Sequence, residues 1–261
     1  MIPSTLSIGC GWEGIRCDPI DYSVTRITLP GVGIFGTIPP GLGQFTSLVV
    51  LDLFGNRFIG TIPQEVLDLP ILEMFNVANS GLEGSFPLFR SKFINFLNIN
   101  GNGFGGELPS DIGDRFPTMI TMELANNTLR GTLPTSMTTL SNLNKFDVGH
   151  NRLVGTIPDD VGNMAQMEGL FLNDNHLIGI IPRSLANPTS RLIQIFVQHN
   201  ALSGTIPASL SEIPNLVDLF LDGKWNFKWI YKVRSDALQM YPNTGHLPRK
   251  QTDWNSTSRA L

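Results

Sequence analysis

Residues 170–182 read LFLNDNHLIGIIP, and the same frame, L-x-L-x-x-N-x-L-x-G-x-I-P, recurs along most of the chain. Residues 51–63, LDLFGNRFIGTIP, fit it position by position. Successive frames begin 24, 24, 22, 25, 24, 24, 25 and 24 residues apart. Their first residues are Ile27, Leu51, Phe75, Leu97, Met122, Phe146, Leu170, Ile195 and Leu219. A period this regular predicts one repetitive solenoid rather than separate globules.

Each position of the frame has a structural reason. Apolar residues at the first and third positions make a short strand with one buried face, and stacked strands share one core and one parallel sheet. An inward asparagine can satisfy backbone groups where the chain leaves the strand, so its replacement by Ala should cost roughly 1–3 kcal/mol. This column comprises Asn56, Asn102, Asn127, Asn151, Asn175 and Asn200, and it is interrupted at Val32, Ser80 and Lys224. Interruptions in the first and last repeats are expected, whereas the one at Ser80 has no explanation at this level.

The second half of each frame predicts how the chain returns. A glycine permits the tight turn, and a proline prevents the following segment from pairing as a central strand. Connecting segments such as PQEVLDLPIL and PDDVGNMAQM carry apolar residues at helical spacing, but they are too short for a free-standing helix. We therefore expect one or two helical turns on the convex side of each coil, with Asp159 and Asp160 at the start of one of them.

The G-x-[IL]-P ending and the period near 24 residues resemble the plant-type class of leucine-rich repeats, found in receptor-kinase ectodomains and polygalacturonase-inhibiting proteins. Residues 10–17, CGWEGIRC, are similar to the C-x-W-x-G-V-x-C end of that class's N-terminal cap, with Ile15 in place of Val. The resemblance implies an α/β solenoid: a right-handed superhelix with a parallel concave sheet and short helical or 3-10 turns on the convex side. It also implies a disulfide between Cys10 and Cys17, and such a bond indicates an oxidising compartment.

We divide the chain into an N-terminal cap at residues 1–26, a solenoid of about nine coils at 27–222, an atypical C-terminal capping segment at 223–241 and a disordered tail at 242–261. In the segment KWNFKWIYKV, aromatic residues from Trp225 to Tyr231 alternate as in a strand that covers the open end of the solenoid. The same mixture also suits a membrane interface, or a tail foreign to a repeat array that was cut short. The chain has no apolar run of membrane-spanning length and no secretory signal, and we expect any such element outside it.

Composition and motifs argue against several chemistries. The formal net charge of -4 provides no basic field for nucleic acid. Two G-x-G-x-x-G matches, at residues 31–36 and 101–106, fall on repeat turns rather than between a strand and a helix, so we expect no cofactor. The cysteine pair has no further ligand at metal-binding spacing, and no histidine has a nucleophile at motif spacing, so we expect neither a metal site nor an enzyme.

The outward residue between the two strand positions changes character halfway along the chain. In order it is Thr28, Asp52, Asn76, Asn98, Glu123, Asp147, Phe171, Phe196 and Phe220. Three stacked phenylalanines with polar neighbours form an apolar patch with a polar rim, which is typical of recognition surfaces, although aromatic residues are also simple strand formers. The predicted ligand-binding residues of the concave face are Lys145, Asp147, His150, Phe171, Asn173, Phe196, Gln198, His199 and Phe220.

We therefore expect a non-catalytic recognition protein, a receptor-type ectodomain or a fragment of one, at the cell surface or outside the cell. Its ligand would be a protein, peptide or carbohydrate, and it would be a monomer or a partner-dependent dimer. One alternative is a secreted inhibitor of a cell-wall-degrading hydrolase. Another is a structural or ice-associating repeat protein, suggested by the column Thr37, Thr61, Thr132, Thr156 and Thr205. Sequons at Asn126 and Asn255 predict glycosylation, but such motifs also arise by chance in an Asn-rich repeat.

Overall fold

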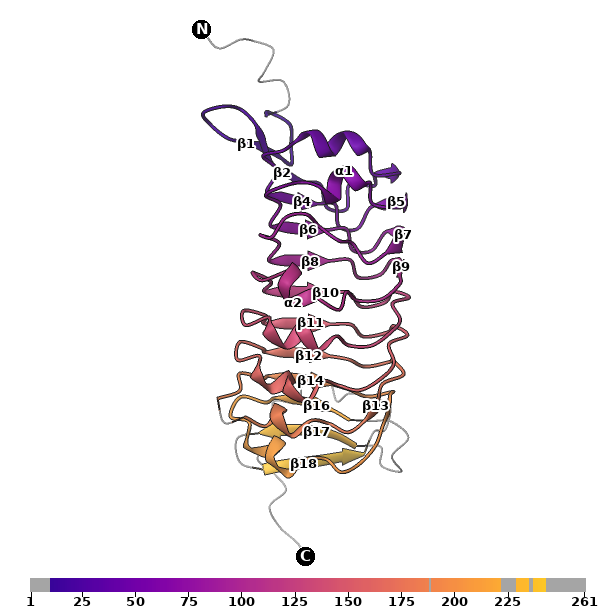
Figure 1. The fold of residues 1–261 in the computed structure, drawn as a ribbon, viewed down its shortest axis with the longest axis vertical. Coiled ribbons are helices and arrows are strands. Elements are labelled where there is room, and N and C mark those ends of the chain that lie inside the picture. Colours follow the sequence, from indigo (N-terminus) through magenta and orange to yellow (C-terminus); the bar gives the residue numbers. More distant parts are fainter. Residues whose placement is uncertain (1–9, 188, 222–228, 235–236, 243–261) are drawn as a thin grey trace, which may run out of the picture.

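The computed structural model describes residues 10–187, 189–221, 229–234 and 237–242, and the repeats form one elongated stack of coils (Figure 1). We number the coils 1 to 9 from Ile27 to Leu219. One strand from each coil enters a parallel sheet that runs along the stack. Within the described residues its strands are Val24–Thr28 (β2), Val50–Asp52 (β4), Met74–Asn76 (β6), Phe96–Asn98 (β8), Thr121–Glu123 (β10), Lys145–Asp147 (β11), Gly169–Phe171 (β12), Gln194–Phe196 (β14) and Asp218–Phe220 (β16). The predicted solenoid is thereby confirmed.

The parallel register aligns equivalent repeat positions in neighbouring coils. Leu51 pairs with Phe75, which pairs with Leu97, and the same alignment continues to Leu219. From Leu51 to Leu219 the first-position side chains are 0% exposed. Each such burial is worth about 1.5–3 kcal/mol relative to exposure, and a coil obtains it only from its neighbours. The repeat frame and the hydrophobic core are therefore the same set of residues.

Asparagine amides connect each coil to the one before it. The Nδ2 of Asn127 donates to the carbonyls of Leu124 and Ala125 in its own coil, at 3.1 Å each, and of Ile99 in the preceding coil, at 3.0 Å. Its Oδ1 accepts the N–H of Phe104, also in the preceding coil, at 3.0 Å. Equivalent bonds recur at Asn56, Asn102, Asn151, Asn175 and Asn200. The role predicted for this column is confirmed.

The two described interruptions of the asparagine column differ from each other. The side chain of Val32 is 59% exposed, which shows that it does not point into the core as the asparagines do. Ser80 reaches only the carbonyl of Asn56, to which its hydroxyl donates at 3.4 Å. Coil 3, which contains Ser80, also has the shortest spacing to its successor, and residues 86–95 contain no helix. The third interruption, Lys224, lies outside the described residues.

The return half of each coil forms a lateral flank and a convex side. Short parallel strands on the flank form two small sheets, Phe35–Gly36 (β3), Arg57–Gly60 (β5), Gly81–Ser85 (β7) and Gly103–Gly105 (β9), then Ile178–Gly179 (β13) and Ala201–Leu202 (β15). The convex side carries the predicted short turns, which are α-helical at Gln64–Leu67 (α1) and Ile112–Arg115 (α2). They are 3-10 at Pro40–Gln44 (η1), Thr135–Thr139 (η2), Asp159–Asn163 (η3), Arg183–Leu185 (η4) and Ala208–Glu212 (η5).

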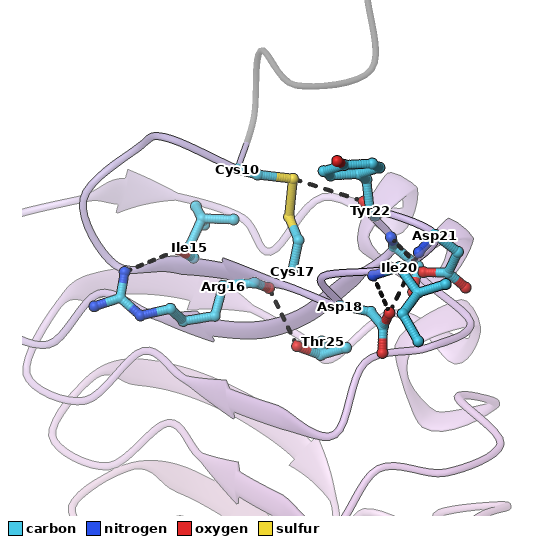
Figure 2. The surroundings of a disulfide bond; sticks show 10 residues. Cys10, Ile15, Arg16, Cys17, Asp18, Ile20, Asp21, Tyr22 and Thr25 are labelled. Atoms are coloured by element: carbon cyan, nitrogen blue, oxygen red, sulfur yellow. Dashed lines mark hydrogen bonds between the residues drawn. A yellow bond between two sulfur atoms is a disulfide. The ribbon is translucent and has the colours of Figure 1, made fainter. Parts of the chain in front are cut away.

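An antiparallel strand and a disulfide close the N-terminal end of the sheet. The strand Ile15–Cys17 (β1) pairs with β2, and the predicted bond between Cys10 and Cys17 closes the loop before it (Figure 2). Gly14 has a φ of 81°, and a Cβ on it would overlap the carbonyl oxygen of Thr28. The glycine of the cap motif is therefore required both by its backbone conformation and by a close approach to the first coil.

Two antiparallel strands continue the sheet beyond coil 9. Trp229–Arg234 (β17) pairs with β16, and Ala237–Pro242 (β18) pairs with β17, so the hydrogen-bonding edge of β16 is occupied. The strand predicted from Trp225 is described only from Trp229 onward. Residues 222–228 and 243–261, which include Asn255 and all but Pro242 of the predicted disordered tail, lie outside the described residues.

The Asn127→Ala variant tests the asparagine ladder. It should lower the free energy of unfolding by about 1–3 kcal/mol, because three carbonyls and one N–H lose a buried partner. The lower midpoint of urea unfolding, with an unchanged slope, measures this loss. Asn144→Ala is the control, since the Asn144 side chain makes no hydrogen bond within the described part of the chain. Equal losses in both variants would contradict the role assigned to the ladder.

Candidate functional site

The concave face of the sheet displays the outward side chains of the coils. In coil 7, the half-buried Phe171 follows the buried Leu170 and points away from the core. The register of β11, β12, β14 and β16 places Asp147, Phe171, Phe196 and Phe220 side by side on successive strands. The outward column expected from the sequence is therefore a continuous row on the surface, which we call the concave row.

The three phenylalanines of the concave row pack edge to face. The ring centroids of Phe171 and Phe196 are 4.9 Å apart at 81°, and those of Phe196 and Phe220 are 4.4 Å apart at 64°. Such pairs contribute about 0.5–1.5 kcal/mol each beyond their burial. All three side chains are half-buried, so the patch is less exposed than the sequence suggests, because each ring covers part of the next.

Space for the first ring of the row comes from Gly169. A Cβ at this position would lie 2.6 Å from Cε2 of Phe171, so the ring folds over the strand where a side chain is missing. The Nζ of Lys145, one coil earlier, lies 5.5 Å from the centroid of the same ring. This distance lies within the range of a cation–π interaction, so Lys145 borders the aromatic half of the row.

Lys145 also borders the polar half of the concave row. Its Nζ contacts Oε1 of Glu123 at 2.6 Å, while Oε2 of Glu123 accepts from Nδ2 of Asn98 at 2.8 Å and of Asn100 at 3.3 Å. The Glu123 side chain is 16% exposed and that of Lys145 is 37% exposed. The charge of Glu123 is therefore compensated inside the protein by one cation and two amides.

Asp147 lies between this network and the phenylalanines. Its Oδ1 accepts the N–H of Gly149 at 3.0 Å, and no lysine, arginine or histidine in the described residues forms an ion pair with it. Burial raises the pKa of Asp147 above its ordinary value, and the nearby charge of Glu123 acts in the same direction. The Gly149 hydrogen bond and the charges of Lys145 and His150 lower this pKa without cancelling the effect of burial. Asp147 is thus a partly desolvated carboxylate without its own counter-ion.

A second cluster lines the rim where the strands end and the chain turns. His150, Asp174 and His199 occupy the same turn position in coils 6 to 8, each with a φ of 53–55°. His199 Nδ1 lies 2.8 Å from Oδ1 of Asp174, and His150 Nε2 lies 3.4 Å from its Oδ2. Nδ2 of Asn173 donates to Oδ2 of Asp174 at 2.8 Å. The two histidine side chains are 53% and 56% exposed and are therefore accessible to a ligand.

Every predicted ligand-binding residue lies in one stretch of the concave face or its rim. In Gln198, which follows the inward Val197 of coil 8, the amide oxygen is buried and accepts no hydrogen bond from the described residues. Sequence reasoning missed Glu123 and Asp174 as members of the site. The repeat pattern could have identified both of them. Glu123 occupies the same repeat position as the predicted Asp147, and Asp174 occupies the same turn position as the predicted His150 and His199.

Other features limit the chemistry of the described residues. They contain no group of three or more His, Cys, Asp or Glu side chains that could hold a metal ion. None of the helices in this part of the chain has the length and apolar character needed to cross a bilayer. Asn126 is exposed at the turn after β10, with a φ of 54°, so a glycan on it would not enter the core.

Comparison with known proteins matches this architecture. The family described as Leucine Rich Repeat matches residues 47–69 and 142–164. A crystal structure of the Arabidopsis receptor kinase HAESA, in complex with the peptide hormone IDA and the co-receptor SERK1, superimposes with a TM-score of 0.75 at 27% identity. That alignment covers 82% of this chain and 37% of the HAESA chain. In sequence and in fold, the chain is therefore similar to plant leucine-rich-repeat receptors.

The curated relatives that this chain matches are much longer than the chain. MDIS1-interacting receptor like kinase 1 from Arabidopsis thaliana is 34% identical over 113 residues, which cover 42% of this chain and 11% of the relative. A plant ice-binding protein of known structure has a TM-score of 0.67 at 19% identity, covering 82% of this chain and 77% of that protein, a likeness that concerns the fold alone. The chain thus spans about a tenth of the length of the receptor kinase that it matches.

The Asp147→Asn variant tests the desolvated carboxylate. A raised pKa in the folded state means that ionised Asp147 costs stability at pH 7, and that this cost is absent once the pH falls below the unfolded-state pKa near ~3.9. The variant should therefore unfold at a higher urea concentration than the wild type at pH 7 and at the same concentration near pH 3. A variant that is less stable at pH 7 would contradict this assignment.

Proposed function

We propose that this chain is the ligand-recognition part of a plant receptor-type ectodomain, or a fragment of one, and that it binds a peptide or protein on its concave face without catalysing a reaction. The observation that carries this proposal is the row of Phe171, Phe196 and Phe220, in register and half-buried, with charged and amide side chains on both sides. An apolar centre with a polar rim is the usual composition of a recognition surface.

The geometry suits binding because the surface is formed before the ligand arrives. The three rings are held by contact with one another and by strands whose inward neighbours are fully buried. Aromatic side chains on a rigid scaffold lose little conformational freedom on binding, and they are common among residues that dominate binding energy. The more exposed rim residues Lys145, His150 and His199 can then supply specificity.

The relatives support the same proposal. The HAESA structure contains a peptide hormone and a co-receptor, and MDIS1-interacting receptor like kinase 1 is a receptor kinase by name. A location outside the cell or at its surface agrees with the Cys10–Cys17 disulfide, since such bonds persist in oxidising compartments. We assign no catalytic role to the chain, because the relatives with solved structures to which it is similar are compared over their repeat ectodomains.

The other functions considered from the sequence have less support. The threonine column on the lateral flank is interrupted by Ser85, Glu107 and Ile180, so it offers no continuous regular array for ice. No feature of the described residues favours an inhibitor of cell-wall hydrolases over a receptor, although such an inhibitor would use the same face.

The double variant Phe171→Ser, Phe196→Ser tests the proposed function. A phage-displayed library of random linear peptides is selected on the wild-type protein, and the recovered peptides are assayed on the variant. Because the apolar centre is removed while the buried strand positions are unchanged, we expect capture to fall at least ~10-fold with the far-UV circular dichroism spectrum preserved.

Phe35→Ser is the matched control, because Phe35 is 84% exposed on the lateral flank, away from the concave row. This variant should capture the peptides as the wild type does. Equal capture by the wild type and the double variant would contradict the proposed site, and failure to select any peptide would contradict peptide recognition.

A further inference from the structure

The charges of the concave face do not balance. Among the described outward strand positions of coils 5 to 9, the acidic residues are Glu123, Asp147 and Asp218, and the only basic residue is Lys145. Lys145 is already engaged by Glu123 at 2.6 Å, and Asp218 accepts a hydrogen bond from Gln194 at 3.0 Å. Asp147 is left as the carboxylate among these positions that has neither a cation nor a side-chain amide as partner, and its one hydrogen bond comes from the backbone N–H of Gly149.

Because of its position, the charge of Asp147 affects which ligands the surface can bind. It lies in the concave row one strand before Phe171, with which it pairs in register. An occupant that covered the phenylalanines would also remove water from this carboxylate. Removing water from an unpaired charge is unfavourable unless the occupant brings a compensating group, so the surface discriminates between ligands by their charge at this point.

The surroundings favour a cation over a neutral donor. The described outward strand positions of coils 5 to 9 carry three carboxylates and one lysine, so their net charge is negative and attracts a positive group as it approaches. The phenylalanine rings next to Asp147 add an apolar contact that suits the methylene stem of a lysine or arginine. Neutral sugars bring no such charge, so a peptide fits this surface better than a carbohydrate.

The spacing of the strands indicates how far the cation of the ligand lies from its apolar side chain. Adjacent strands are about 4.8 Å apart, so Asp147 lies roughly 5 Å from the Phe171 strand and 10 Å from the Phe196 strand. In an extended peptide along the solenoid axis, side chains two residues apart point the same way at a separation of about 6.6 Å. A cation over Asp147 therefore places the side chain two residues away between Phe171 and Phe196.

We propose that the occupant of the concave row is an extended peptide that places a lysine or arginine side chain on Asp147 and an apolar side chain, two residues away, against Phe171 and Phe196. This inference rests on the proposed function and deepens it, because it specifies the chemistry of the ligand. It also assigns separate roles to the residues of the site. The phenylalanines provide the apolar contact, Asp147 selects a charge, and Glu123 keeps Lys145 from competing for Asp147.

The test uses the peptides recovered by phage selection on the full chain. We expect the selected sequences to be enriched in Lys or Arg with Phe, Leu, Ile, Met, Tyr or Trp two positions away. A synthetic peptide of that pattern and its Lys→Gln or Arg→Gln analogue are then titrated by calorimetry into the wild type and into Asp147→Asn. Loss of the cation should weaken binding to the wild type roughly 10-fold, the effect of losing one charge-assisted hydrogen bond, and should have little further effect on the variant.

Asp52→Asn is the matched control. Asp52 occupies the equivalent position of coil 2 and accepts an N–H from Phe54, as Asp147 accepts one from Gly149. It lies outside the phenylalanine half of the row, so its substitution should leave the full 10-fold discrimination between the two peptides. Equal discrimination by the wild type and by Asp147→Asn would overturn the inference.

Three further outcomes distinguish this inference from the proposed function on which it rests. Peptides that need Phe171 and Phe196 but carry no cation, or an acidic residue in its place, would overturn the charge assignment and leave the recognition function standing. Capture of neutral cell-wall oligosaccharides that needs the same phenylalanines, with no peptide selected, would overturn the peptide as the ligand class. Binding that is indifferent to the phenylalanines would overturn both.

Discussion

The fold depends on asparagine amides that each bind the backbone of two consecutive coils. In an isolated coil, the carbonyls where the chain leaves the strand would lack partners, and their burial would be costly. The amide of Asn127 satisfies carbonyls at Leu124 and Ala125 and reaches back to Ile99. Because the same atoms bridge every pair of coils that has the asparagine, the register between neighbouring strands is set, and with it the identity of the residues that face outward.

Function follows from this register. A shift of one residue in a strand would bury Phe171 and bring Leu170 to the surface. A continuous aromatic row therefore requires that consecutive coils keep the same alignment. The row then changes from polar to apolar between Asp147 and Phe171. Lys145 stands at that boundary, since it contacts the carboxylate of Glu123 on one side and the ring of Phe171 on the other.

Much of this arrangement was predictable from the sequence, because the repeat position of a residue determines whether it faces the core or the solvent. The buried first-position residues and the asparagine ladder were placed correctly on this basis. The nine predicted site residues lie on the face or rim that their repeat positions indicate, and their role in binding stays a prediction. Contacts between side chains were not predictable, because they depend on rotamers of residues more than twenty positions apart in the chain. The Glu123–Lys145 pair and the contact of Asp174 with His199 belong to this second group. The space that Gly169 leaves for the ring of Phe171 is local in the chain, but it too depends on a rotamer. The spacing of the repeats in the sequence also could not show that the phenylalanine rings cover one another.

The display of the concave row can be measured directly by thiol labelling, since the only cysteines of the protein are joined in a disulfide. Cysteine is introduced singly at Ile195, Phe196 and Val197, and the rate of modification is recorded under native conditions. Modification should be rapid at position 196 and slow at 195 and 197, where reaction requires opening of the core. Faster modification at 195 or 197 than at 196 would show that the strand faces the other way, and the recognition surface described above would not exist.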